Sequence, residues 1–205
     1  GNFNIQSASE LAMLLRSGAL PADIEIIEER TVGPGLGQDS INSGAKAAAV
    51  GIAAIFAFAI VYYGIMGLFV VLSLSLNLTI LIGVMSMFGI TLTLPGIAGM
   101  VLTLAMAIDA NVLIYERTKE EKRRGKSPFA SLEDGFNLAW GSILDSNLTT
   151  LFAAFFLFQF GSGPIRGFAV ALSLGIATSI FTSVTVLKMI IWGWIKIFQP
   201  KDIPL

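Results

Sequence analysis

Two carboxylates in otherwise apolar stretches are the residues of this chain whose type and position suggest chemistry. Residues 47–108 contain no Asp, Glu, Lys or Arg, and Asp109 follows them directly, with Asn111 close behind. A carboxylate in the hydrocarbon layer costs about 2.5–3.5 kcal/mol on insertion scales, and such residues usually mark a path for ions, protons or substrate. We therefore expect Asp109 to be a titrating or ion-coupling group; the alternative is a carboxylate hydrogen-bonded for packing.

The second acid, Asp145, lies among other polar residues of a later apolar stretch. These supporting polar residues are Ser146, Asn147, Thr149 and Thr150. We expect the helices of Asp109 and Asp145 to be antiparallel, which places both carboxylates at comparable depth. This predicts either a wet interface or a hydrogen-bond network inside the bundle, and a structural role for Asp145 stays open. Equal depth does not show that the two side chains face each other.

Composition excludes several kinds of site. The chain has no Cys and no His, so thiol catalysis, disulfides and imidazole bases are excluded, and proton chemistry must use carboxylates. The glycines of 33–37 lack the GxGxxG and GxxxxGK[ST] patterns of phosphate-binding loops. We expect no catalytic residue, no metal and no nucleic-acid partner.

The elements that position the acids are membrane-spanning helices. The chain is 55% hydrophobic and 13% charged, and its long apolar runs indicate an all-α integral membrane protein. The predicted five-helix transmembrane bundle has spans at roughly 45–63, 67–88, 94–115, 136–159 and 165–187. One of these helices carries an i+4 stripe that would let neighbouring helices approach closely. The stripe consists of Gly99, Thr103, Ala107 and Asn111.

Charge in the loops predicts the orientation. The loop 117–135 and the C-terminus are basic, whereas 1–43 is acidic and the loops near 89–93 and 160–164 are almost neutral. The positive-inside rule places the loop 117–135 and the C-terminus in the cytoplasm, and five spans then place residues 1–43 outside. Arg166 falls in an outer, periplasmic turn, where we expect an interfacial anchor. The run 117–126 reads as a solvated helix that can also contact acidic lipid headgroups.

Residues 1–43 resemble the end of a water-soluble domain. The spacing Ser7 to Glu10 predicts a capped helix ending near Gly18, and residues 24–27 predict a short strand. A stretch this short cannot form a core alone, so we interpret 1–43 as a short α/β remnant and linker of a periplasmic domain in a fragment. Residues 44–205 form the second predicted domain, the transmembrane bundle with its cytoplasmic loop.

Four patches occur in an order that resembles the SecD family, membrane subunits of bacterial preprotein export within the resistance-nodulation-division (RND) superfamily. The patches are 14–37 (LLRSGALP and EERTVGPGLG), 107–117 (AIDANVLIYER), 145–150 (DSNLTT) and 161–169 (GSGPIRGFA). The resemblance implies that the bundle is spans 2–6 of an RND-type six-helix half in the bacterial inner membrane. It also implies partnership with SecF, YajC and the SecY translocon, and unfolded preproteins as substrates.

The same resemblance implies that the proton motive force drives late steps of export, with protons as the coupling ion and no other cofactor. Asp109 matches the family's fourth-span acid, a proton-path residue; Asp145 matches the fifth-span motif, and its part in proton transfer is less secure. The alternatives are an RND exporter of lipids or small molecules and a passive translocon scaffold. An intramembrane aspartyl protease is disfavoured, because neither acid follows the Gly-x-Gly pattern typical of that class. We therefore expect a translocase subunit rather than an enzyme.

Overall fold

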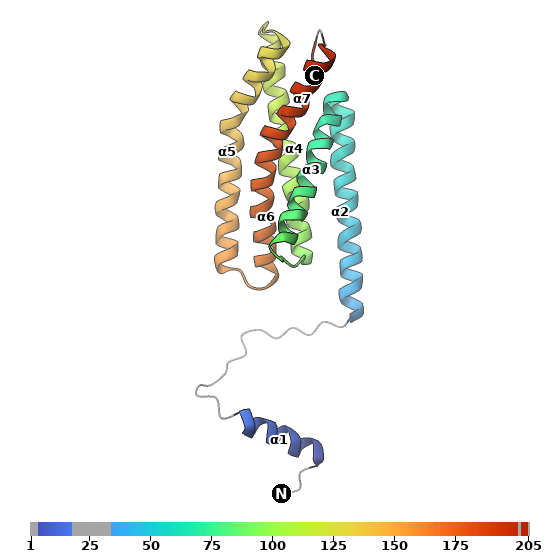
Figure 1. Ribbon diagram of the computed structural model, residues 1–205, viewed down its shortest axis with the longest axis vertical. Coiled ribbons are helices and arrows are strands. Elements are labelled where there is room, and N and C mark those ends of the chain that lie inside the picture. Colours follow the sequence, from blue (N-terminus) through green and yellow to red (C-terminus); the bar gives the residue numbers. More distant parts are fainter. Residues whose placement is uncertain (1–3, 18–33, 201, 205) are drawn as a thin grey trace. The chain divides into compact units, whose positions relative to one another are not determined.

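The computed structural model describes residues 4–17, 34–200 and 202–204, with no side-chain description for residues 14, 16, 17 and 34–38. Within these ranges every regular element is a helix, which confirms the predicted all-α class (Figure 1). The predicted strand at 24–27 lies outside the described residues, as does Gly33. Residues 4–36 and 37–205 belong to two separate compact units.

The first unit contributes helix α1 (Ile5–Ser17), which confirms the predicted N-terminal helix. Its cap differs from the prediction. The side-chain oxygen of Asn4 accepts a hydrogen bond from the backbone N–H of Ser7 at 2.8 Å, so Asn4 caps the helix and Ser7 lies inside its first turn. Asn is as favourable an N-cap as Ser, so the helix can begin one turn earlier than the Ser7 spacing predicts.

The second unit contains five helices long and apolar enough to cross a membrane, as predicted. The fifth of them consists of two α-helices joined by a π-helical turn, η1. The elements are α2 (Pro34–Tyr63), α3 (Ile65–Met87), α4 (Leu94–Arg123), α5 (Pro128–Phe160), α6 (Pro164–Phe181), η1 (Thr182–Val186) and α7 (Leu187–Phe198). Several helices extend past the predicted spans, because their charged ends stay helical outside the apolar segment. Residues 34–43, expected to form a linker, are part of α2 for the same reason.

Local chemistry fixes where the helices begin and turn. The hydroxyl oxygens of Thr93 and Ser127 accept hydrogen bonds from the backbone N–H groups of Gly96 and Ala130, and a proline follows each cap. The α4–α5 turn needs Gly125, whose φ of 85° is unfavourable for residues with a side chain. These signals make α4 and α5 a tight antiparallel hairpin.

Helix α4 is the centre of the bundle and packs on α3, α5, α6 and η1. The predicted stripe of small and polar residues, including Gly99, Thr103, Ala107 and Asn111, is buried there. On α6, a Cβ atom added to Gly175 would collide with the Thr103 side chain. Small residues therefore hold α4 and α6 close together, as they do in many membrane helix pairs.

Ion pairs tie together the end of the bundle that carries the α4–α5 turn. The ammonium of Lys126 lies 2.5 Å from a carboxylate oxygen of Asp134 and 2.5 Å from one of buried Glu121. These two carboxylates raise the pKa of Lys126. Lys122 lies 2.7 Å from Asp202, and its ammonium lowers the pKa of that carboxyl. The C-terminal segment is thereby held at the same end as the α4–α5 turn.

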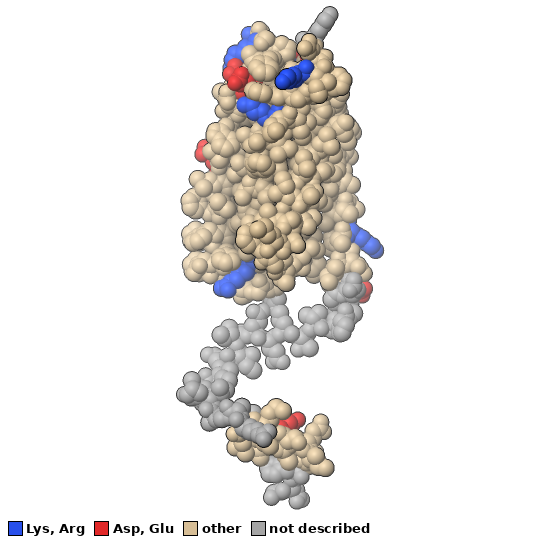
Figure 2. Space-filling model, viewed as in Figure 1, with Lys and Arg blue, Asp and Glu red and all other residues tan. Residues whose placement is uncertain are grey.

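Charged side chains gather at this end, and an almost uncharged surface covers the middle of the visible face (Figure 2). The α3–α4 and α5–α6 turns lie at the opposite end (Figure 1). The charge pattern of the sequence predicts the basic loop and the two almost neutral loops on different sides, and in the fold they lie at opposite ends of the bundle.

Replacing Gly175 with Val should destabilise the bundle, because the new side chain overlaps Thr103 of α4. Overpacking of this kind costs about 1–3 kcal/mol. We expect a lower midpoint of thermal unfolding in detergent. The matched control is Gly83→Val on α3, where an added Cβ meets nothing within 4 Å. Equal midpoints for the two variants would contradict the close α4–α6 approach.

Candidate functional site

Asp109 lies near the middle of α4, and its side chain is exposed on the surface of the bundle. Among the described residues, its carboxylate makes no hydrogen bond and no ion pair. The residues on either side along the chain, Ile108 and Ala110, are half-buried and buried. The acid is therefore carried by the packed central helix but points out of the bundle.

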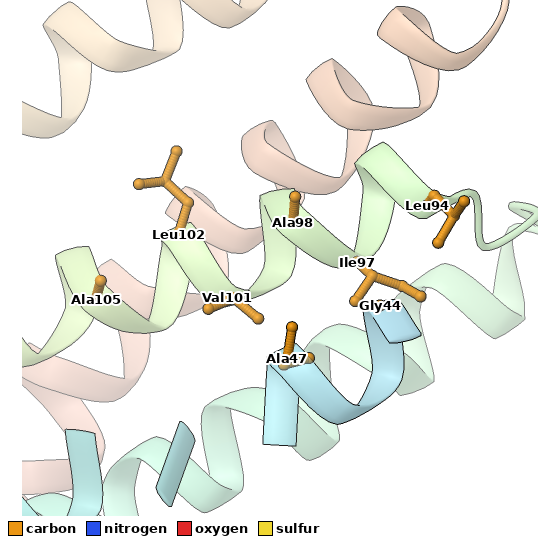
Figure 3. A pocket seen from close by; sticks show the side chains of 9 residues that line it. Gly44, Ala47, Leu94, Ile97, Ala98, Val101, Leu102 and Ala105 are labelled. Atoms are coloured by element: carbon orange, nitrogen blue, oxygen red, sulfur yellow. The ribbon is translucent and has the colours of Figure 1, made fainter. Parts of the chain in front are cut away.

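A continuous exposed flank of α4 leads to Asp109. It consists of Ala98, Leu102 and Ala105, which lie at helical spacing from Asp109. The same three residues form one side of an apolar pocket of about 490 Å³, which Gly44 and Ala47 of α2 border (Figure 3). In Figure 3, Ile97 and Val101 point toward α2, whereas Ala98 and Leu102 lie on the other flank.

Helix α2 leaves this flank uncovered because it packs loosely. Only 6% of its most apolar window is buried, against 39% for α4. It approaches α4 where a Cβ on Gly44 would meet the Leu94 side chain at 2.8 Å. The site around Asp109 is thus open to whatever adjoins the bundle in the membrane.

Asp145 also lies near the middle of its helix, and α5 packs directly on α4. Its side chain is exposed and makes no hydrogen bond or ion pair with the described residues, so the two acids are not bonded to each other. The hydroxyl of Thr149 donates to the backbone oxygen of Asp145 at 2.8 Å, and that of Thr150 donates to Ser146 at 3.1 Å. Of the two alternatives predicted here, a network between helices does not include these hydroxyls, because they bond within their own helix. The other alternative, a wet interface, stays a prediction. Ser146 and Thr149 are exposed beside Asp145.

Asn111 and Asn147 point the opposite way, into the bundle. Asn111 is fully buried, and neither its side-chain oxygen nor its nitrogen has a hydrogen-bond partner among the described residues. The Asn147 nitrogen donates to the Ile143 backbone oxygen at 2.7 Å, while its oxygen has no such partner. Buried amides normally have partners, supplied by protein or ordered water. These positions are therefore suited to hold water inside the bundle.

The structure adds polar residues that sequence reasoning missed. Buried Asn77 of α3 accepts a hydrogen bond from the Thr178 hydroxyl at 2.9 Å. Ser73 donates to the backbone oxygen of Thr182 at 3.0 Å, and Ser183 to that of Ala107 at 3.5 Å. The sequence contains a sign of these residues, because residues 178–185 of the last span are rich in Ser and Thr.

This polar run coincides with the π-helical turn η1. A π-helical turn inserts one extra residue in the helix and occurs often at functional sites. Here it exposes backbone oxygens to side chains of α3, and it brings Ser183 to α4. Buried polar groups thus meet where η1 contacts α3 and α4.

Arg166 lies apart from both acids, in the first turn of α6. Its Nε donates to the backbone oxygen of Gly161 at 2.9 Å. The side chain is exposed and closes its own turn. Within the described ranges, no three His, Cys, Asp or Glu residues are grouped as a metal site would require.

Comparison with known proteins identifies the family of this architecture. Residues 15–196 match the family model described as protein export membrane protein SecD/SecF, C-terminal. The chain is 53% identical over its full length to the protein translocase subunit SecD of Rickettsia bellii, of which it covers 40%. It is also 53% identical to SecD of Calditerrivibrio nitroreducens, over 99% of this chain and 39% of the relative.

A solved structure has the same fold. The crystal structure of SecDF, a translocon-associated membrane protein from Thermus thermophilus, superposes with a TM-score of 0.83 and 41% identity, covering 98% of this chain and 28% of that chain. The chain thus spans about two fifths of the length of the curated relatives it matches. On these grounds the chain belongs to the SecD/SecF C-terminal family of protein export membrane proteins.

Proposed function

We propose that this chain is the membrane-spanning part of a SecD-type subunit. Together with SecF, this subunit uses the proton motive force to promote late steps of preprotein export. The observation that carries the proposal is the exposed Asp109 carboxylate in the middle of a membrane-spanning helix. SecD relatives at 53% identity support the export role. Proton coupling rests on the position and chemistry of Asp109.

The exposure of Asp109 favours a protein partner over lipid on this side of α4. A carboxylate facing acyl chains has no group to hydrogen-bond with, which is costly. The alanines 98 and 105 on the same flank let another helix approach closely. A SecF half packed on this flank would cover the acid and supply the polar groups that it lacks here.

The buried polar interior gives a proton a route past α4. Asn111 lies half a helical turn from Asp109 and is fully buried, so it faces the other way, into the bundle. Water held at such amides would connect the interior with the level of the exposed acid. We assign Asp109 as the site of protonation. Asp145, with Ser146 and Thr149 exposed beside it, is the second proton-path residue.

The remaining partners follow from the family. We propose the SecY translocon and YajC as neighbours, unfolded preproteins as substrates, and the bacterial inner membrane as the location. No part of the proposal requires a cofactor, a hydrolytic site or nucleic acid. An RND exporter of lipids or small molecules is disfavoured, because the relatives reported above are SecD subunits.

Replacing Asp109 with Asn should abolish stimulation of export by the proton motive force while leaving the subunit inserted and assembled. Asn keeps the size and hydrogen-bonding capacity but cannot carry a proton across. The measurement is completion of preprotein export in vesicles, with and without an imposed proton gradient, in the full-length protein.

The controls are Asp109→Glu, which keeps a titratable acid and should retain part of the stimulation, and Asp39→Asn, an exposed acid at the start of α2. Unchanged export in the Asp109→Asn variant would make the acid structural and favour the passive scaffold.

We also propose that the loop 117–135 and the C-terminus are cytoplasmic, and that residues 1–43 and Arg166 are periplasmic. The chain has no Cys, so labelling of a single introduced Cys shows on which side of the membrane that residue lies. Arg123→Cys should react with a membrane-impermeant maleimide only after cells are opened, and Ser162→Cys should react in intact cells; both residues are exposed. The reverse pattern would invert the topology.

A further inference from the structure

Helix α7 carries a basic stripe at the end of the bundle where the α4–α5 turn lies. Lys188, Trp192 and Lys196 follow one another at i, i+4 and i+8 and therefore lie along one side of the helix. Neither lysine makes an ion pair with a described carboxylate, unlike Lys119, Lys122 and Lys126. Two cations beside a tryptophan are thus left without a counter-charge.

The ammonium of Lys188 is held over aromatic rings. It lies 5.0 Å from the ring centroid of Trp192 and 5.6 Å from that of Phe136 on α5. The residue is half-buried, so its stem packs along apolar surface while its ammonium lies against the two rings. Cation–π contacts of this kind orient the cation but leave its charge uncompensated.

A pocket of about 410 Å³ is lined in part by Trp192, the residue whose ring the Lys188 ammonium contacts. It is lined by Phe129, Trp192, Gly193, Ile195 and Lys196. The rings of Phe129 and Trp192 stand 5.3 Å apart, and Gly193 leaves open space where any other residue would place a side chain. The pocket is therefore an apolar slot between α5 and α7 with a lysine at its edge.

Neighbouring acids leave the site positive. Asp134 and Glu121 are paired with Lys126, Glu121 is also paired with Arg124, and Asp202 is paired with Lys122. Glu133 of α5 is exposed and makes no ion pair with either lysine of the stripe. The charge of Lys188 and Lys196 is thus available to an external anion.

Apolar side chains near the pocket are exposed on the surface of the bundle. Met189, Ile197 and Phe198 of α7 are each more than two thirds exposed. On a membrane protein such side chains meet acyl chains, with tryptophan and lysine at the level of the headgroups. An anion reaching the site would therefore come from the bilayer.

We propose that Lys188 and Lys196 bind the headgroup phosphate of an anionic phospholipid, in the leaflet on the side of the α4–α5 turn. One acyl chain of the lipid lies in the slot beside Gly193, against Phe129 and Trp192. Basic pockets between membrane helices are suited to acidic headgroups. The two lysines distinguish an anionic lipid from a zwitterionic one, whose amine would oppose them.

The test uses Trp192 as the reporter. A Trp140→Phe/Trp194→Phe chain, in which Trp192 is the one remaining tryptophan, is reconstituted in phosphatidylcholine bilayers containing phosphatidylglycerol with brominated acyl chains. Quenching gives the relative association of the two lipids at Trp192. We expect phosphatidylglycerol to be preferred about five-fold. Lys188→Gln/Lys196→Gln should reduce the ratio to about one, since no charge then selects the anion.

Controls separate a bound lipid from bulk attraction and from misfolding. Arg166→Gln, at the opposite end of the bundle, should keep the preference, as should Lys188→Arg/Lys196→Arg. A chain with Trp140 as its single tryptophan should show no preference. If the double Gln variant fails to elute as a folded species, Lys196→Gln alone, at an exposed residue, serves in its place. Equal association of both lipids in the unsubstituted chain, or a preference that survives removal of the lysine charge, would overturn the proposal.

Discussion

An exposed carboxylate in the hydrocarbon layer is the constraint on which the account of this molecule depends. Asp109 is carried by a helix that packs on α3, α5, α6 and η1, yet its side chain is exposed. A charged group in this position is costly unless another polar surface meets it. The flank of α4 that carries Asp109 is therefore where we propose that a partner contacts the bundle.

The opposite face of α4 packs against the other helices of the bundle. Small residues let α6 approach closely, which brings buried amides and hydroxyls together at the π-helical turn. Asn111 there keeps both polar atoms unpaired among the described residues. Helix α4 thus carries an exposed acid, Asp109, on one face and a buried amide, Asn111, on the other, and the proton path proposed above starts from these two faces.

The membrane-spanning helix α4 and its candidate site could be predicted from the sequence, because a long apolar run that ends at a single Asp indicates both. The stripe from Gly99 to Asn111 likewise predicted the packing seam. The direction of each side chain could not be predicted, because a helix with apolar residues all round has no pattern that marks its inner face. For that reason the sequence left a wet interface and a hydrogen-bond network open around Asp145; the Thr149 and Thr150 hydroxyls bond to backbone oxygens of their own helix. The π-helical turn was missed because it depends on contacts from Ser73 and Ser183.

The most direct test asks what covers the Asp109 flank in the assembled complex. An A105C variant places one thiol a helical turn from Asp109, in a chain with no other cysteine, and M189C on exposed α7 is its matched control. Both are treated in bilayers with a membrane-soluble maleimide, with and without SecF. We predict that SecF protects the A105C thiol and leaves the M189C thiol equally reactive. Equal labelling of A105C with and without SecF would mean that lipid covers this flank, and would contradict the partner interface.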